Sequence, residues 1–382
     1  MKNPLRVMCV VGTRPEVIKM APVVRALRER GIAAPILATA QHRGLLDQML
    51  STFHLRPDWD LDIMKPDQEL AQLTGNLIPG LHQILKENRP DAMLAQGDTT
   101  TVFCAALAAF YACVPFGHVE AGLRSGDMAA PFPEEGMRRL SAVLSRWHFA
   151  PTETSALALR NEAHTENAIH VVGNTVIDAL LEVADTHDLP WPQGVPPLAE
   201  GQRLVLITLH RRENFGEALE RILSSLRTFA LAHPEARLVY PVHPNPNVQG
   251  PAHRILGGLH NVSLIEPLDY PVLVRLMKES FLVLTDSGGI QEEAPALGKP
   301  VLVFRNVTER PEAVLAGGVH LVGSDSDLFS SEIESLWSDP TAYAAMAQRR
   351  FPYGDGKASQ RIVDVLIRDL RPSQATPDVP LS

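Results

Sequence analysis

Short apolar runs rich in β-branched residues alternate along this chain with longer amphipathic segments. Such alternation of strand-like and helix-like segments is typical of a parallel sheet covered by helices. The sequence therefore predicts an α/β protein. Its first strands are expected at 6–11, 36–39, 92–96, 116–120, 148–150 and 170–172, and the helices between them at 17–29, 45–53, 69–86, 100–112 and 134–146.

A second series of the same kind follows the segment 189–197, the densest cluster of proline and glycine, where we expect a hinge. Strands are predicted at 204–209, 238–242, 262–265, 281–285 and 300–304, and helices at 217–232, 272–279, 290–297 and about 358–370. At 382 residues the chain is too long for one compact core. We predict two Rossmann-like doubly wound domains with a cleft between them: residues 1–175, completed by the last helix, and residues 176–357. Residues 371–382 are expected to form a disordered tail.

Composition and charge exclude some classes of binding partner and indicate where the protein is located. The chain carries 35 Lys and Arg against 44 Asp and Glu, a net charge of -9, which argues against nucleic acid or an anionic membrane as a partner. The longest apolar run, 102–114, is shorter than the roughly 20 residues of a membrane span, and the N-terminus lacks a signal-peptide pattern. Cys9, Cys104 and Cys113 lie in apolar stretches without metal-ligand spacing, so we expect reduced core residues. These features predict a soluble cytoplasmic protein.

Polar residues follow most of the predicted strands directly. Ligands of doubly wound sheets bind beyond the carboxyl ends of the strands, so these residues are the candidates for chemistry. They are 12–14, 41–43, 97–99, 120–122, 210–214, 243–245 and 286–289. We expect them to line one cleft if the two domains turn these edges toward each other.

The segment from Asp286 to Gly289 ends an apolar strand and opens a helix. Free amides and the positive end of the helix dipole suit a phosphate there; the alternative is that Ser287 only caps the helix and the glycines only turn the chain. Glu292 and Glu293 are expected in the first helical turn, where they either complement the dipole or grip a ribose diol. The chain has neither a P-loop motif nor a three-glycine dinucleotide fingerprint, which argues against a P-loop nucleotidase and against bound NAD.

Three carboxylates have positions that suit acid/base chemistry. Asp98 precedes a run of threonines and could be a helix N-cap, and Glu134 could be an ordinary first-turn residue. Glu120 ends a strand with no turn signal before it, so we expect a buried or cleft-facing carboxylate with a shifted pKa.

Cationic or donor groups stand out against the acidic background of the chain. They would suit a diphosphate, although each alone could equally be a surface charge. They are Arg14, Lys19, His210, Arg211, Arg212 and His243. The sequence shows neither a His or Cys metal motif nor a Gly-x-Ser-x-Gly motif, so metal hydrolysis and serine-nucleophile chemistry are not indicated.

The motifs, taken in order, closely resemble those of one family. They are Gly-Thr-Arg-Pro-Glu at 12–16, Gln-Gly-Asp-Thr-Thr at 96–100, Val-Glu-Ala-Gly-Leu-Arg at 119–124, Pro-Phe-Pro-Glu-Glu at 131–135, Gly-Asn-Thr at 173–175, His-Arg-Arg-Glu-Asn at 210–214, the stretch 285–295 and Thr-Glu-Arg-Pro-Glu at 308–312. The family is that of the non-hydrolysing UDP-N-acetylglucosamine 2-epimerases, and the resemblance spans about 7–370.

This resemblance implies a glycosyltransferase-B-like fold and a homodimer. It also implies reversible conversion of UDP-N-acetylglucosamine to UDP-N-acetylmannosamine for surface polysaccharide synthesis, without NAD or metal. The implied route eliminates UDP to leave a 2-acetamidoglucal and adds it back.

The resemblance also implies roles for individual residues. Asp98, Glu120 and Glu134 resemble the catalytic carboxylates, and His210 and Arg14 resemble groups that contact UDP near the reacting centre. The further substrate-binding residues are Lys19 near the phosphates, Ser287, Gly288 and Gly289 in the pyrophosphate loop, Glu293 at the ribose, and the donors Arg211 and His243.

The chain departs from the family pattern at a second, activating UDP-N-acetylglucosamine site. Gln41 and His42 match that site, but Gly44 and Asp67 stand where Gln and Arg are expected. Loss of a phosphate-pairing Arg would cost about 1.5–3 kcal/mol, so activation by substrate is not expected.

A second departure is Met137, which stands where the family usually has Asn, so one polar contact beside Glu134 is missing. The alternative functions are therefore action on another UDP-2-acetamido sugar, such as a UDP-2,3-diacetamido uronic acid, and that of a glycosyltransferase-B-type transferase.

Overall fold

The computed structural model describes residues 4–39, 43–63 and 68–371. They fall into two compact units, Met1–Ala179 with Gly354–Ser382 (unit 1) and Leu180–Tyr353 (unit 2). The division lies within one helix, and the segment 189–197, where we expected a hinge, lies inside unit 2. Of the tail predicted at 371–382, all but Arg371 lies outside the described residues, as do Gln41, His42 and Asp67.

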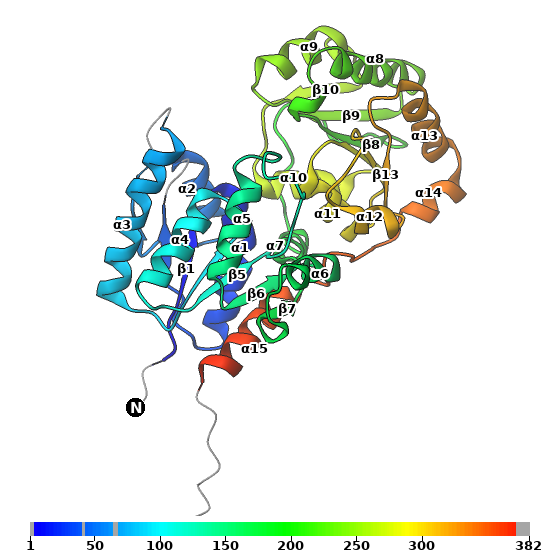
Figure 1. Ribbon diagram of the computed structural model, residues 1–382. Helices are drawn as coiled ribbons and strands as arrows, with labels where there is room; N and C mark the ends of the chain where they lie inside the picture. The colour runs from blue at the N-terminus through cyan, green and yellow to red at the C-terminus, as the bar shows by residue number, and fades with distance from the viewer. Residues whose placement is uncertain (1–3, 40–42, 64–67, 372–382) are drawn as a thin grey trace, which may run out of the picture. The chain divides into compact units, whose positions relative to one another are not determined.

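Unit 1 is built on a seven-stranded parallel sheet with the order β3-β2-β1-β4-β5-β6-β7 and helices on both faces (Figure 1). The strands are β1 (Val7–Val11), β2 (Ile36–Ala38), β3 (Trp59–Asp60), β4 (Ala92–Gln96), β5 (Phe116–Val119), β6 (Trp147–Ala150) and β7 (Ile169–Val171). The helices are α1 (Arg14–Glu29), α2 (Arg43–Thr52), α3 (Leu70–Asn88), α4 (Thr100–Tyr111), α5 (Glu134–Leu144), α6 (Glu153–Asn161), α7 (Thr175–Ala184) and α15 (Ala358–Leu370).

The last helix, α15, belongs to unit 1 although it follows all of unit 2 in the sequence. Asp178 fixes its first turn, because the carboxylate accepts the backbone N–H groups of Ala358 at 3.2 Å and Ser359 at 2.8 Å. Near the other end, the indole of Trp147 donates to Asp369 at 2.8 Å.

Unit 2 is built on a six-stranded parallel sheet with the order β10-β9-β8-β11-β12-β13. Its strands are β8 (Arg203–Thr208), β9 (Ala236–Pro241), β10 (Val262–Ile265), β11 (Leu282–Thr285), β12 (Val301–Val303) and β13 (Val319–Leu321). Its helices are α8 (Glu217–Ala232), α9 (Pro246–Leu256), α10 (Tyr270–Glu279), α11 (Gly288–Ala296), α12 (Pro311–Leu315), α13 (Ser326–Ser338) and α14 (Pro340–Met346).

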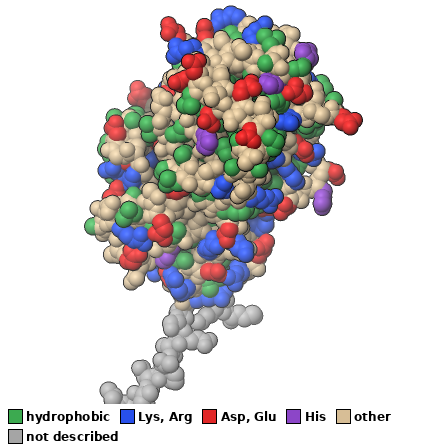
Figure 2. All heavy atoms as spheres, turned by 90° about the vertical axis from the view of Figure 1, so that its right-hand side faces the viewer, with side chains coloured by type: hydrophobic (Ala, Val, Ile, Leu, Met, Phe, Trp, Pro, Cys, Tyr) green, Lys and Arg blue, Asp and Glu red, His purple; other side chains and the backbone are tan. Residues whose placement is uncertain are grey.

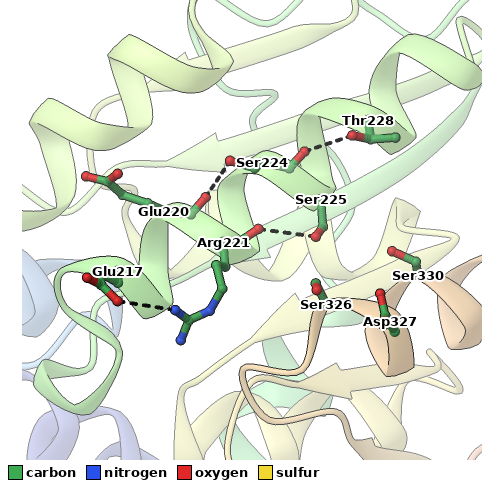
Figure 3. A pocket seen from close by; sticks show the side chains of 9 residues that line it. All are labelled: Glu217, Glu220, Arg221, Ser224, Ser225, Thr228, Ser326, Asp327 and Ser330. Atoms are coloured by element: carbon green, nitrogen blue, oxygen red, sulfur yellow. Dashed lines mark hydrogen bonds and ion pairs between the residues drawn. The ribbon is translucent and has the colours of Figure 1, made fainter.

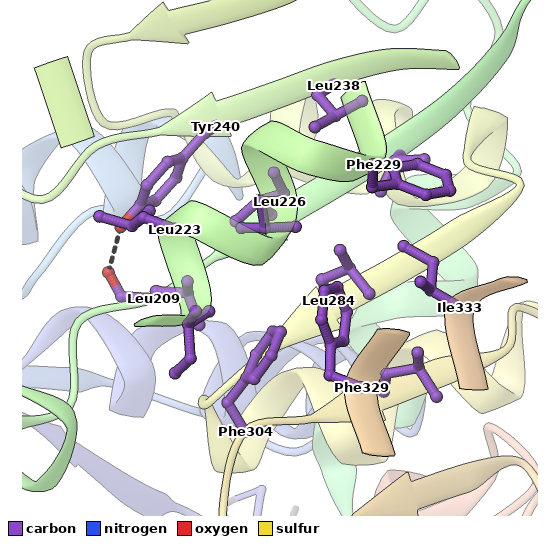
Figure 4. Close-up of a cluster of buried hydrophobic side chains, with 14 of the residues drawn as sticks. Leu209, Leu223, Leu226, Phe229, Leu238, Tyr240, Leu284, Phe304, Phe329 and Ile333 are labelled. Carbon is purple, nitrogen blue, oxygen red and sulfur yellow. Dashed lines mark hydrogen bonds between the residues drawn. The ribbon is translucent and has the colours of Figure 1, made fainter. Parts of the chain in front are cut away.

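The core of unit 2 explains why the sequences of these strands are continuous runs of apolar residues. A parallel sheet is covered on both faces, so successive strand residues are all buried. Leu226 and Phe229 of α8 belong to one buried cluster with Leu284 of β11 and Tyr240 of β9 (Figure 4). The hydroxyl of Tyr240 is satisfied there by the carbonyl of Leu209 at 2.8 Å.

The predicted strands and helices are present, with ends that differ by a few residues. The prediction missed β3, β13, α6, α7, α9, α12, α13 and α14. Helix α9 contains two prolines: Pro246 occupies the first turn, where proline is tolerated, and Pro251 lies farther along. Cys9 and Cys104 are buried as expected, whereas the prediction for Cys113 is wrong: α4 ends before it, and it lies exposed in the following turn.

Two further features are the distribution of charge on the surface and the length and apolar character of the helices. Acidic and basic side chains are interspersed on the face drawn in Figure 2. None of the helices in the described residues combines the length and the apolar character required to cross a bilayer.

The strand order reverses between β1 and β4 in unit 1, and between β8 and β11 in unit 2. In doubly wound sheets, ligands bind beyond the carboxyl ends of the strands at such a reversal. The segments that follow β1, β4, β8 and β11 are therefore the ones that the fold itself marks as candidate sites.

Candidate active site

Glu120 follows β5 directly and is a buried carboxylate, 8% exposed, as expected from the sequence. Oε1 accepts from Lys19 Nζ at 2.6 Å and from Asn174 Nδ2 at 2.8 Å, and Oε2 accepts from the Gln96 side chain. Its φ of 63° is in the left-handed region, which is costly for a residue other than glycine. One cation and two amides thus hold this carboxylate in a fixed orientation.

Asp98 is not the cap of α4; Thr99 is, and its hydroxyl accepts from the N–H of Val102 at 3.4 Å. The carboxylate of Asp98 instead accepts from Arg138 Nη2 at 2.5 Å. Arg138 is 9% exposed and also lies 3.3 Å from Glu135, so its position on α5 is fixed from two sides. Asp98 and Glu120 therefore have different cationic partners, Arg138 and Lys19.

Glu134 is the first residue of α5, as the first-turn interpretation predicted. One of its carboxylate oxygens, Oε2, is buried and has no hydrogen-bond partner in the described part of the chain. Buried polar atoms are rarely left unpaired in folded proteins. This oxygen is therefore a candidate for contact with a substrate.

The turn after β1 carries Arg14, which is exposed, and Glu16, which is 2% exposed. Burial raises the pKa of Glu16 to about 7, although hydrogen bonds from Thr99, Gly12 and Thr13 oppose the rise. Glu16 ends the Gly-Thr-Arg-Pro-Glu motif at 12–16, but no role was predicted for it from the sequence.

In unit 2, Asp286 is fully buried at the end of β11 and organises the loop after β8. Its carboxylate accepts from the backbone N–H groups of His210, at 3.0 and 3.1 Å, and Arg211, at 2.9 Å. The side chain of Asn214 donates to it at 3.0 Å. The exposed ring of His210 stacks on that of His243, with centroids 5.8 Å apart and planes 18° apart.

The helix α11 begins at Gly288, and Ser287 occupies the N-cap position without a side-chain capping hydrogen bond. Two guanidinium groups lie beside this helix start. A Cβ atom added to Gly288 would lie 3.6 Å from Arg211 Nη2 and 3.7 Å from Arg310 Cζ. Free amides, the helix dipole and two cations together favour a bound anion such as a diphosphate.

The prediction that Glu292 and Glu293 lie in the first turn is wrong, because the helix starts with the glycines and its first turn has no acidic residue. Both carboxylates are buried further along α11. Glu292 pairs with the guanidinium of Arg310, and Glu293 Oε1 accepts from the hydroxyl of Tyr270 at 2.6 Å. Burial in this pair raises the pKa of the Tyr270 hydroxyl well above its usual value.

Several residues at the site had no predicted role. They are Gln96, Arg138, Asn174, Asp286 and Arg310. A polar residue at the end of an apolar strand is the signal that could have found Gln96 and Asp286, since such a side chain must have a partner when buried.

A polar cavity of about 630 Å³ lies apart from these residues, between α8 and α13 (Figure 3). Two of its hydroxyl groups bond within α8: Ser224 donates to the carbonyl of Glu220 at 2.7 Å, and Ser225 to that of Arg221 at 3.2 Å. None of the residues predicted for the site lines this cavity. Among the described residues, no group of three or more His, Cys, Asp or Glu side chains is placed to hold a metal ion.

A family model described as UDP-N-acetylglucosamine 2-epimerase matches residues 25–367. The UDP-N-acetylglucosamine 2-epimerase of Yersinia pestis is 51% identical over 369 residues, 95% of this chain and 98% of the relative. The crystal structure of UDP-GlcNAc 2-epimerase from Neisseria meningitidis bound to UDP-GlcNAc is similar with a TM-score of 0.88 and 48% identity, covering 95% of this chain and 100% of that one. The Methanocaldococcus jannaschii enzyme in complex with UDP-GlcNAc and UDP is similar with a TM-score of 0.78 and 31% identity, covering 95% and 100%.

Proposed function

Since this chain belongs to the UDP-N-acetylglucosamine 2-epimerase family, we propose that it interconverts UDP-N-acetylglucosamine and UDP-N-acetylmannosamine. The relatives whose structures hold UDP-GlcNAc, at 48% and 31% identity, support this substrate class. The observation that carries the proposal is the pair Asp98 and Glu120. These carboxylates follow neighbouring strands, β4 and β5, and are held by different cations.

The proposed reaction removes the proton at C2 and breaks the bond between C1 and the diphosphate oxygen. A 2-acetamidoglucal with a double bond between C1 and C2 remains, together with UDP. The diphosphate oxygen then adds back to C1, and C2 receives a proton on the opposite face. No electrons are gained or lost overall, so the route needs no hydride carrier.

Within unit 1, the carboxylates Asp98, Glu120 and Glu134 would supply the base on one face of C2 and the acid on the other. General acid and base groups held in different environments are what such a two-faced proton transfer requires. Lys19 bonds to Glu120 in this structure, so its charge would neutralise that carboxylate.

Within unit 2, the start of α11 with Arg211 and Arg310 would bind the diphosphate. Charge that develops on the departing UDP is stabilised by fixed donors and cations, which lowers the barrier to C1–O cleavage. Glu293, oriented by Tyr270, would bind the ribose diol. His210, whose loop Asp286 fixes, would lie near the reacting centre.

The proposed location of the protein is the cytoplasm.

The proposal also includes a homodimer. Large apolar side chains are exposed on the neighbouring helices α4 and α5: Phe110 and Tyr111 are 61% and 58% exposed, and Val143 is 75% exposed. Exposed apolar side chains on two helices that contact each other suit an interaction surface. A second copy of the chain is the proposed occupant of this α4–α5 face.

Proton NMR of the purified protein with UDP-N-acetylglucosamine in D2O, with EDTA and without NAD, tests the reaction. We expect UDP-N-acetylmannosamine to appear, with deuterium at C2 of both sugars at equilibrium. Net release of UDP would instead favour a transferase or hydrolysing enzyme. Turnover only of a UDP-2,3-diacetamido uronic acid would move the substrate to that class, to which Met137 points.

A further inference from the structure

Glu16 is a buried acid to which no role has been given. Its Oε2 accepts from the backbone N–H groups of Gly12 at 2.5 Å and Thr13 at 3.2 Å. Its Oε1 accepts from the hydroxyl of Thr99 at 2.7 Å. The carboxylate therefore joins two segments that lie 83 residues apart in the sequence.

A helix cap accounts for only half of this arrangement. Thr13 is the N-cap of α1 and Glu16 is its third residue, which is the geometry of a capping box. A capping box is complete within one helix. Glu16 reaches further, to Thr99, which is the N-cap of α4, so one side chain ties together the starts of two helices.

The two joined turns follow β1 and β4, the strands between which the sheet order of unit 1 reverses. The turn after β1 is closely packed against the start of α4: a Cβ atom added to Gly12 would lie 2.5 Å from Oγ1 of Thr39, which follows β2, and 2.6 Å from Oγ1 of Thr101 in α4. The first turn carries Arg14, and the second carries Asp98 directly before Thr99. A shift of one turn would therefore be transmitted to the other.

We propose that Glu16 is a positioning residue whose carboxylate locks the turn that carries Arg14 to the turn that carries Asp98. Its burial is consistent with such a role, because a buried acid is costly to keep and is retained most often at functional sites. The inference rests on the proposed function, in which Asp98 takes part in proton transfer at C2.

The test removes the link without removing either site residue. Thr99→Val keeps the volume of the side chain and deletes the hydroxyl that donates to Glu16. We expect kcat for epimerisation of UDP-N-acetylglucosamine to fall about 10- to 100-fold with KM within about threefold, because a displaced catalytic group costs rate more than binding. Thr99→Ser, which restores the hydroxyl, should return kcat to within about threefold of the wild-type value.

Thr152→Val is the matched control, because Thr152 is also the N-cap threonine of a helix in unit 1 and accepts from the N–H of Ser155 at 3.2 Å. If Thr99 acts only as a cap, both valine variants will lower the melting temperature and leave kcat unchanged, which overturns the inference. A drop in kcat confined to Thr99→Val supports it.

Glu16→Gln tests the link to Thr99 from its other side, and it keeps the inference testable if Thr99→Val fails to fold. The amide has one acceptor oxygen, so it cannot accept from the two backbone N–H groups and from the Thr99 hydroxyl as the carboxylate does. We expect a loss of kcat of about tenfold, and a double variant no worse than the more damaged single one, because both changes break one link. Additive losses, or full activity of Glu16→Gln, would contradict the inference. A wild-type protein without epimerase activity would instead overturn the proposed function, and this inference with it.

Discussion

The guanidinium of Arg138 donates to the carboxylate of Asp98 at 2.5 Å, and the two residues lie 40 positions apart on different elements. Arg138→Met should leave Asp98 without this partner and lower kcat about tenfold or more, since the orientation of an acid/base group governs its efficiency. Steady-state kinetics measures the effect. Arg139→Met is the control: Arg139 contacts Glu135 at 2.9 Å, and its side chain is 39% exposed. Equal losses in the two variants would show that the pairing with Asp98 has no special part in catalysis.

The three candidate catalytic carboxylates should be separable from UDP binding. We expect Asp98→Asn, Glu120→Gln and Glu134→Gln each to reduce turnover at least about 100-fold, the scale of general acid/base catalysis, with UDP affinity within about threefold. NMR in D2O follows turnover, and calorimetry measures the binding of UDP. Glu153→Gln, at a side chain that is 75% exposed and paired with Arg160, should be fully active. Full activity in all three site variants would refute the proposed roles.

The hydrogen bond from Tyr270 to Glu293 should support nucleotide binding. Tyr270→Phe removes the donor from a buried carboxylate, so we expect the Kd for UDP to rise about 3- to 10-fold, which corresponds to the loss of about one hydrogen bond. Tyr343→Phe is the matched control, because Tyr343 donates to a backbone carbonyl, that of Phe281, at 3.1 Å. An unchanged Kd in Tyr270→Phe would remove Tyr270 from the binding site.

Acid should destabilise the protein through histidines buried in the sheet of unit 1. Burial, with further repulsion from nearby cationic groups such as Arg124, lowers the pKa of His118 to about 4 and of His148 to about 3, both below the ordinary value of 6.5. The unfolded chain therefore takes up these protons first. The stability that the neutral rings contribute is present above pH 6.5 and is lost as the pH falls toward 4.

Urea unfolding between pH 7 and pH 4.5 measures this loss of stability. In His148→Phe we expect the decrease in the free energy of unfolding to be smaller than in the wild type by about 2–3 kcal/mol. His187→Phe, at an exposed histidine, should follow the wild-type curve. Identical curves for His148→Phe and the wild type would contradict this assignment.

The class of fold could be predicted from the sequence because it depends on local patterns, and the same patterns marked the candidate site residues at the ends of the strands. Apolar strands and the polar residues after them are adjacent in the chain, so Glu120 and Asp98 could be found directly. The residues that bind these two carboxylates could not be found in this way. Arg138 and Asn174 reach these carboxylates from 40 and 54 residues away, and no local spacing encodes such a pairing.

The error at α11 has a related cause. The predicted helix began at residue 290, after Gly288 and Gly289, which placed Glu292 and Glu293 in its first turn; the low helical propensity of glycine favours such a boundary. In the structure the glycines begin the helix, and Arg211 and Arg310 lie beside Gly288.

The attachment of α15 to Asp178 has a consequence for the synthesis of the protein. The two ends of this contact are 180 residues apart, and all of unit 2 lies between them. Unit 2 is continuous in sequence, so all of it is synthesised while unit 1, although begun first, still lacks a helix. The surface of unit 1 under α15 therefore stays uncovered until α15 has itself been synthesised and has left the exit tunnel.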